Sequence, residues 1–144
     1  MIVMFVVSFP LMFALMGMKH DPVSEIPQPH SGVQNSITNG EKVYTKYCLT
    51  CHQADGSGVP NMTPPLIQTS FVLGDKEKLI NIVLKGLKNV DIDDQTYNNP
   101  MPALGSVLKD QEIADVLSYV RNSFGNKASA VTVAEVKTAR GKSK

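Results

Sequence analysis

Cysteine is scarce in this sequence, because its 144 residues include only two. Two cysteines cannot build the disulfide framework that supports many small exported domains. The net charge is also small, at +1, which argues against nucleic acid or any strongly charged partner. No segment repeats at a fixed period, which argues against a solenoid. The length and the 19% of charged residues are instead those of one globular domain.

Charge is absent altogether from residues 1–18, and Lys19 is the first charged side chain. A cleaved signal peptide would carry basic residues in front and an A-x-A-like site, neither of which is present. A membrane-spanning helix needs about 17–25 apolar residues, and this run lies at the lower end of that range. We therefore favour a hydrophobic N-terminal helix that anchors the chain in a membrane, with a cleaved signal peptide as the alternative. Both interpretations predict that the rest of the chain is exported.

The next segment, residues 19–36, contains three prolines and no apolar period, which predicts a flexible linker. Thr38 and Glu41 have the spacing of a capping box, so we expect a helix to begin near Asn39 and run into the cysteine pair.

Two more helices are predicted downstream. Asp75 can cap a helix whose apolar positions include Leu79 and Val83. Lys109 or Asp110 opens a last helix with one apolar face; its members are Ile113, Val116, Leu117, Val120 and Phe124. The loops between the helices are long, at about residues 53–70 and 88–107. After a domain spanning 37–126, residues 127–144 are predicted to form a basic tail with at most a short turn.

Three helices with such long loops bury little apolar surface by themselves, so we expect something else to fill the core. The two cysteines stand together as Cys48-Leu-Thr-Cys51, followed directly by His52. A structural zinc site would need a second pair of ligands, and a thioredoxin-like redox pair would need a βαβ unit. A plain disulfide would leave His52 unexplained. Covalent attachment of haem to both thiols, with His52 as proximal iron ligand, accounts for all three residues.

Haem iron has a second axial position, and two methionines outside the leader are candidates for it. Met62 lies ten residues after His52, beside the proximal ligand, so we interpret it as core filler. Met101 lies in a separate loop between Pro100 and Pro102, which stiffen the backbone around it. We favour Met101 as the second ligand. His30 could serve only if the linker folded back.

The chain resembles the bacterial class I c-type cytochromes over residues 37–126. The resemblance is carried by these motifs: Gly40-x-x-x-Tyr44, Cys48-x-x-Cys51-His52, Pro64-Pro65-Leu66, Tyr97-Asn-Asn-Pro100-Met101-Pro102 and Ser118–Asn126. It implies an all-α fold in which three main helices and long loops wrap around one covalently attached haem c. Many relatives carry tryptophan at the position of Phe124, and this chain has none.

The resemblance also implies roles for single residues. His52 and Met101 would be the axial ligands, and the carbonyl of Pro64 (or Pro65) would accept a hydrogen bond from His52 and so fix its imidazole. Leu66 completes the Pro-Pro-Leu motif beside the haem, and Tyr97 is a weaker candidate for a haem propionate. Gly40 would let the first and last helices approach closely.

An iron whose two axial positions are filled by protein has no room for a substrate. The expected function is therefore single-electron transfer between membrane or periplasmic redox partners, such as a membrane oxidase, reductase or dehydrogenase, and the chain is not expected to be an enzyme. The expected location is the periplasm, anchored to the outer face of the inner membrane by residues 1–18, or soluble there if that segment is cleaved. The alternatives are a haem-based sensor or small-ligand binding protein with a labile sixth ligand, and the haem subunit of a dehydrogenase or oxidase complex.

Overall fold

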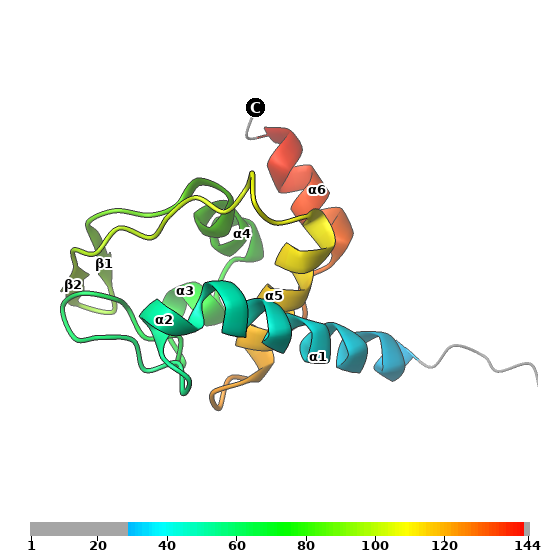
Figure 1. The fold of residues 1–144 in the computed structure, drawn as a ribbon, viewed down its shortest axis with the longest axis horizontal. Helices are drawn as coiled ribbons and strands as arrows, with labels where there is room; N and C mark the ends of the chain where they lie inside the picture. Colours follow the sequence, from blue (N-terminus) through cyan, green and yellow to red (C-terminus); the bar gives the residue numbers. More distant parts are fainter. Residues whose placement is uncertain (1–28, 143–144) are drawn as a thin grey trace, which may run out of the picture.

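The computed structural model describes residues 29–142, which form a helical fold with one small hairpin (Figure 1). The elements in chain order are α1 (Pro29–Tyr47), α2 (Leu49–His52), α3 (Ser70–Leu73), α4 (Lys76–Lys85), β1 (Val90–Ile92), β2 (Gln95–Tyr97), α5 (Asp110–Asn122) and α6 (Val133–Lys142). Helices α1, α4 and α5 are the three long helices that the sequence predicts. Long loops join them, as expected.

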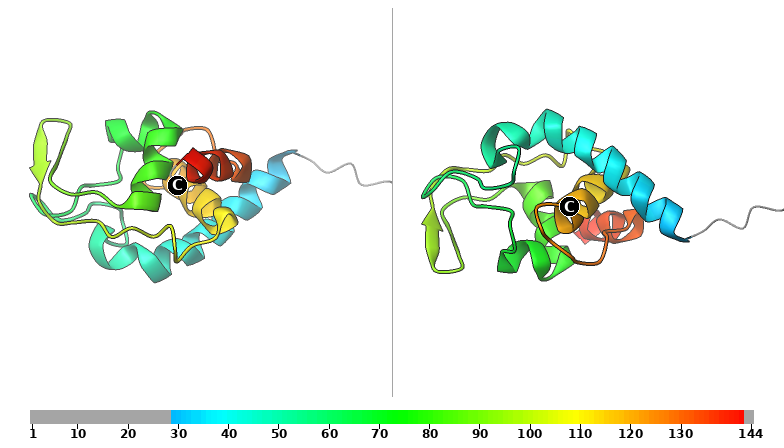
Figure 2. Two further views of the ribbon diagram at one scale, coloured as in Figure 1. Left: turned by 90° about the horizontal axis from the view of Figure 1, so that it is seen from above. Right: turned by 90° about the horizontal axis from the view of Figure 1, so that it is seen from below.

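The closest approach between elements is the crossing of α1 and α5, which Figure 2 shows from two sides. Gly40 lies at the crossing, and a Cβ atom placed there would clash with the carbonyl of Asp115 and lie 2.7 Å from the Cβ of Tyr119. Only glycine permits this distance between the two backbones. The predicted role of Gly40 is therefore confirmed.

Three aromatic rings fill the space beside this crossing. The ring of Tyr44 is 5.4 Å from the rings of both Tyr119 and Phe124, which are 5.6 Å from each other. The Tyr44 hydroxyl donates a hydrogen bond of 2.6 Å to the carbonyl of Gln53, the residue after the cysteine motif. The cluster thus joins the helix crossing to the predicted site.

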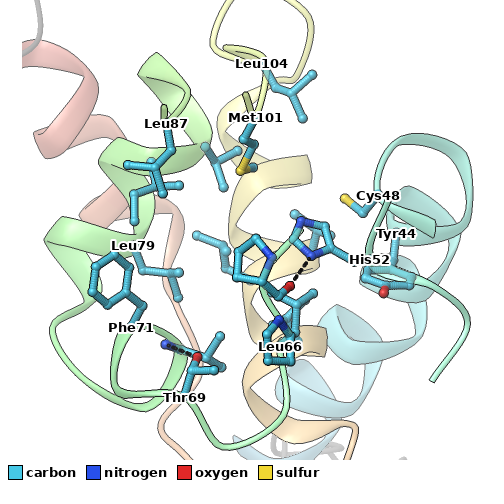
Figure 3. A pocket seen from close by; sticks show the side chains of 18 of the residues that line it. Tyr44, Cys48, His52, Leu66, Thr69, Phe71, Leu79, Leu87, Met101 and Leu104 are labelled. Atoms are coloured by element: carbon cyan, nitrogen blue, oxygen red, sulfur yellow. Dashed lines mark hydrogen bonds between the residues drawn. The ribbon is translucent and has the colours of Figure 1, made fainter. Parts of the chain in front are cut away.

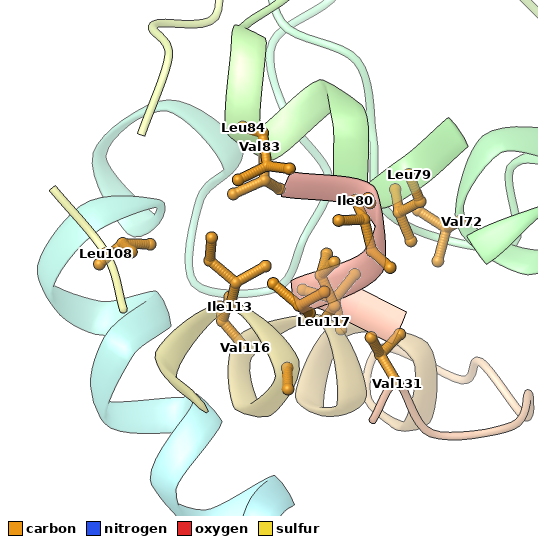
Figure 4. Close-up of a cluster of buried hydrophobic side chains, with 14 of the residues drawn as sticks. Val72, Leu79, Ile80, Val83, Leu84, Leu108, Ile113, Val116, Leu117 and Val131 are labelled. Carbon is orange, nitrogen blue, oxygen red and sulfur yellow. The ribbon is translucent and has the colours of Figure 1, made fainter. Parts of the chain in front are cut away.

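The apolar core lies between α4, α5 and α6 (Figure 4). Among its least exposed side chains are residues of all three helices and one residue of α3: Ile80, Ile113, Ala114, Val136, Ala139 and Val72. The apolar face predicted for the last helix is buried, apart from Phe124 at its end, which is half-buried. Val116, Leu117 and Val120 of this core also line the cavity described below, so the core and the cavity are continuous.

The predicted start of α4 is correct, and its capping residue acts as expected. Asp75 accepts a hydrogen bond of 2.7 Å from the backbone amide of Lys78. At the start of α5, Lys109 takes the capping position without a side-chain cap, and the carboxylate of Glu112 accepts 2.8 Å from its backbone amide. This reciprocal bond replaces part of the serine or threonine cap that the sequence lacks.

The predicted start of α1 is about ten residues too late. The helix begins at Pro29, so the last eight residues of the predicted linker, 29–36, are helical. Thr38 does not cap, because its hydroxyl donates 3.1 Å to the carbonyl of Gln34 one turn earlier. Two residues before Thr38, the Ser36 hydroxyl donates to the buried carboxylate of Asp115 on α5. Contact with α5 therefore extends the helix toward the N-terminus, beyond the start that the local sequence predicts.

The predicted basic tail is also wrong for most of its length, because residues 133–142 form helix α6. The exposed fraction is at most 1% for Val136 and Ala139, and it is 4% for Val131 in the preceding segment. Helix α6 contacts both α4 and α5. The sequence did not predict this helix because its apolar pattern is weak. The side chains of Val136 and Ala139 are enough to pack it against the surface formed by α4 and α5.

The hairpin formed by β1 and β2 was not predicted either. Val90 pairs with Tyr97, and Ile92 pairs with Gln95 across the turn. Asp93 and Asp94 in the turn have φ angles of 50° and 63°, which suit a two-residue hairpin turn. Residues 90–97, which fall in the long loop predicted at about residues 88–107, thus form a short hairpin.

The hydrophobic helix predicted for residues 1–18 and the start of the linker lie outside the described residues. Within residues 29–142, no helix is both long enough and apolar enough to cross a membrane.

Replacing Gly40 by alanine is predicted to lower the free energy of unfolding by about 2–3 kcal/mol, because the added methyl group must push α1 away from α5. The matched control is Gly32→Ala in the same helix, where nothing lies within 4 Å of the added Cβ. The control should raise the stability by about 0.5–1 kcal/mol through helix propensity. Urea unfolding of the two variants measures both effects, and equal stabilities would contradict the close crossing.

Candidate functional site

Two adjoining cavities occupy the space between α2, α4, α5 and the loop that carries Met101 (Figure 3). The space within them, including the part that is open to solvent, is about 710 and 640 Å³. The residues that line both cavities include Cys48, His52, Pro64 and Met101. The residues predicted from separate parts of the chain therefore meet at one place.

His52 ends α2 and is 8% exposed. Its Nδ1 atom lies 3.1 Å from the carbonyl oxygen of Pro64, as predicted from the resemblance. When Nδ1 carries the proton and donates this bond, Nε2 is left with a free lone pair. Burial lowers the pKa of His52 below its usual value, and the bond to Pro64 opposes this. The neutral imidazole, which is the form that binds metals, is therefore favoured.

The turn after His52 brings Pro64 back to the imidazole. The backbone amide of Gly58 donates 3.1 Å to the carbonyl of His52, and that of Leu66 donates 2.7 Å to the carbonyl of Gly56. Gly58 has a φ of 64°, and a Cβ atom there would lie 2.6 Å from the Pro64 oxygen. A side chain at Gly58 would thus disturb the acceptor of the His52 hydrogen bond.

One cysteine lies just before α2 and the other lies within it. Cys48 is the residue before α2, and its backbone amide donates 2.8 Å to the carbonyl of Tyr44 at the end of α1. Burial, followed by the nearby Cys51, raises the pKa of the Cys48 thiol to about 11. Cys51 is exposed and lines only the smaller cavity, whereas Cys48 lines both. Both sulfur-bearing side chains thus lie on the His52 side of the site.

Met101 reaches the cavity from another element. Its backbone pairs with Leu87 just after α4, with N–O distances of 2.8 and 3.1 Å. Figure 3 shows its sulfur turned into the cavity on the side facing His52. The thioether and the imidazole therefore come from opposite walls of one apolar space.

The predictions for Met62 and Tyr97 are not confirmed in full. Met62 is 52% exposed and lines neither cavity, so its interpretation as core filler is wrong. Its exposure is consistent with the prediction that it is not the ligand. Tyr97 is buried in β2 but also lines neither cavity, so the structure does not bring it to the site. The hairpin, which was not predicted, directs its side chain elsewhere.

Several apolar residues of the site were not singled out from the sequence. Phe71 of α3, Ile92 of β1 and the loop residues Leu104 and Leu108 all line the larger cavity. Ile92 is an isolated apolar residue in an acidic stretch, and Leu104 and Leu108 stand four apart just before a helix. Apolar residues in loops that are otherwise rich in polar residues are the signal that could have identified these positions.

Asn126 fastens the loop that carries Pro64 and Leu66 to the end of α5. It is 3% exposed, and its side-chain nitrogen donates 2.8 Å to the carbonyls of both Leu66 and Val120. Its side-chain oxygen accepts 2.7 Å from the amide of Gln68. These bonds are buried or partly buried, so Asn126 helps to determine where this wall of the cavity lies.

The residues present suit a flat, apolar, metal-containing group. The larger cavity is lined mainly by aliphatic and aromatic side chains, with one neutral imidazole and one thioether aimed into it. The free thiol of Cys48 lines this cavity and that of Cys51 lines the adjoining one, so both are available for covalent attachment. A zinc site has less support, because residues 29–142 contain no cluster of three or more His, Cys, Asp or Glu side chains that could hold a metal.

Comparison with known proteins gives two kinds of relatives. Residues 37–124 match the profile of the cytochrome c family. Cytochrome c-552 of Thermus thermophilus is 34% identical over 114 residues, which cover 72% of this chain and 86% of that protein. The cytochrome c subunit of the alcohol dehydrogenase (quinone) of Gluconacetobacter polyoxogenes is 36% identical over 99 residues, or 67% of this chain and 21% of that subunit.

A similar match is the gluconate 2-dehydrogenase cytochrome c subunit of Pantoea cypripedii, at 36% identity over 98 residues and 22% of its length. This chain thus spans about a fifth of the length of the dehydrogenase subunits that it matches.

Replacing Asn126 by alanine is predicted to lower the free energy of unfolding by about 2–4 kcal/mol, because buried backbone groups lose their partners. The matched control is Asn122→Ala at the end of the same helix, whose side chain bonds only one turn back, at 2.9 Å from the Ser118 carbonyl. The control should change stability by no more than about 0.5 kcal/mol. Chemical unfolding distinguishes them, and equal effects would mean that Asn126 does not fasten the loop.

Proposed function

Because this chain belongs to the cytochrome c family, we propose that His52 and Met101 are the axial ligands of its haem iron and that Cys48 and Cys51 form the thioether bonds. As a member of that family the chain is an electron-transfer protein with covalently bound haem c, and it carries electrons rather than transforming a substrate. The haem supplies an iron that accepts and releases one electron at a time. The observation that carries the ligand assignment is the placing of an imidazole and a thioether in one apolar cavity.

The chain's own residues would fix both ligands before an electron arrives. The Pro64 carbonyl holds the His52 ring by its Nδ1 proton and so sets the direction of Nε2. The backbone pairing with Leu87 holds Met101. Ligands that keep their positions in both oxidation states suit electron transfer, because little of the protein has to move when the charge changes.

The apolar lining has a second consequence. The cavity walls exclude water from the space between His52 and Met101, and thioether ligation favours the reduced iron. Both features are expected to raise the reduction potential. An iron with both positions filled also leaves no site for a small ligand, which makes the sensor alternative the weaker one.

The partners proposed for this chain are redox proteins, because several relatives are named as cytochrome subunits of dehydrogenases. The chain could receive electrons from such a dehydrogenase, or act as its haem subunit. We further propose that it works in the periplasm and that residues 1–18 attach it to the outer face of the inner membrane, on the strength of their apolar composition. A tether would keep the haem near a membrane partner at high effective concentration.

Replacing Met101 by alanine is predicted to open the sixth position, so that the reduced protein binds carbon monoxide and the oxidised protein loses its weak far-red sulfur-to-iron band. Met62→Ala is the matched control and should leave both spectra unchanged, because Met62 is exposed and lines neither cavity. Absorption spectra of the two variants with and without carbon monoxide measure this. A response from Met62→Ala alone would exchange the two roles.

Replacing Cys48 or Cys51 by alanine is predicted to remove one of the two thioether bonds, with haem held by the other or lost. Thr50→Ala, between the two cysteines, serves as the control and should attach haem normally. Intact-protein mass and haem retention after denaturation give the readout. Normal attachment in both cysteine variants would rule out the proposed covalent link.

A further inference from the structure

The segment that connects Met101 to α5 is tied to α4 along one edge. Beyond the pairing of Met101 with Leu87, the amide of Leu104 donates 2.9 Å to the carbonyl of Val83. The amide of Gly105 donates 3.2 Å to the carbonyl of Leu84. These bonds hold the segment as far as Gly105. The turn at 105–108 that leads into α5 is closed by local bonds, in which the amides of Val107 and Leu108 donate 3.0 and 2.9 Å to the carbonyl of Leu104.

That turn is held from the other side by Arg140 of α6. The guanidinium Nη2 donates 3.0 Å to the carbonyl of Leu108, and Nη1 donates to the carbonyl of Gly105. Nε donates 2.6 Å to the carboxylate of Asp110 in the first turn of α5. The Arg140 side chain is 29% exposed. One side chain therefore joins α6 to both ends of the turn and to the helix that follows.

Helix α6 is itself anchored without Arg140. Val136 and Ala139 are buried against α4 and α5. The Lys76 ammonium of α4 lies 2.8 Å from Glu135 and donates 2.9 Å to the carbonyl of Ala130. Residues 127–142 lie beyond the part of the chain that matches the family, which ends at residue 124. Helix α6 is thus a fixed platform that does not depend on Arg140 for its own position.

We propose that Arg140 is a positioning residue, which holds the turn at 105–108 and so keeps the Met101 thioether on the iron. This inference rests on the proposed function, in which Met101 is the second axial ligand. A thioether is a weak ligand, so the fraction bound depends on how freely its loop can move away. Leu104 and Leu108 line the same cavity as Met101, so a shift of the turn reaches the site directly.

The physical basis is the strength of the three bonds that Arg140 makes. Hydrogen bonds with a charged donor are about twice as strong as neutral ones, and a planar guanidinium can make several at once. Without it, the carbonyls of Gly105 and Leu108 would have to turn toward water, and the loop would gain freedom. That freedom favours the state in which Met101 has left the iron.

The test uses the full-length, haem-loaded protein with Arg140→Ala and, as matched control, Lys142→Ala. Lys142 is on the same helix but makes an exposed ion pair with Glu77, away from the Met101 loop. The readout is the pH at which the far-red sulfur-to-iron band disappears as hydroxide and neutral amines compete for the iron. Since one charge-assisted bond changes an equilibrium about tenfold, Arg140→Ala should lower that pH by about one unit. Lys142→Ala should leave it unchanged.

Carbon monoxide binding to the reduced protein is the second readout, and Arg140→Ala should bind it about tenfold more tightly than the control. Arg140→Lys provides a milder variant if the alanine variant does not accumulate, because it keeps the charge but cannot reach all three acceptors. It should shift both readouts in the same direction by a smaller amount.

Two results would overturn the inference. If Arg140 variants unfold more readily in urea but match Lys142→Ala in band and carbon monoxide response, Arg140 is only structural. If the wild-type protein lacks the far-red band, Met101 is not the ligand, and the proposed function fails together with this inference. In the first case the wild-type protein still shows the far-red band, so only the positioning role of Arg140 is refuted and the proposed function stands.

Discussion

The close crossing of α1 and α5 is the contact on which the remaining arrangement depends. It is possible because Gly40 has no side chain where the Asp115 carbonyl and the Tyr119 side chain approach it. The crossing sets the position of Tyr44, whose hydroxyl holds the carbonyl of Gln53. It thereby places α2, and with it the cysteine motif, at the cavity that the apolar face of α5 also lines. A site at the end of one helix is thus located by a contact several turns away.

The two proposed axial ligands are supported by different parts of the fold. His52 depends on a local turn, in which Gly58 leaves room for the Pro64 carbonyl and Asn126 fastens the following loop to α5. Met101 depends on long-range contacts with the end of α4 and, through the next turn, with Arg140 of α6. The imidazole side is therefore expected to be the more rigid one. The thioether side is where contacts with α6 can adjust the affinity of the iron for its ligand.

Local signals in the sequence predict α4 and α5 well, because Asp75 caps the first and a single apolar face identifies the second. They fail for α1, where Thr38 bonds backward and Ser36 contacts Asp115 on another helix. They fail again for α6, whose burial depends on a surface formed by α4 and α5. In each failure the decisive partner lies far away in the chain, so no window of neighbouring residues contains the information.

The chemistry could be inferred without the fold, because the spacing of Cys48, Cys51 and His52 permits covalent haem attachment and Met101 between two prolines is a candidate second ligand. Those inferences need only residue types and short distances along the chain. Tertiary structure alone decided that Tyr97 lies away from the cavity, that Met62 is exposed, and that Asn126 and Arg140 support the two walls of the site. The roles of Asn126 and Arg140 come from hydrogen bonds to backbone carbonyls. Every residue has such a carbonyl, so the sequence does not reveal which ones are the partners.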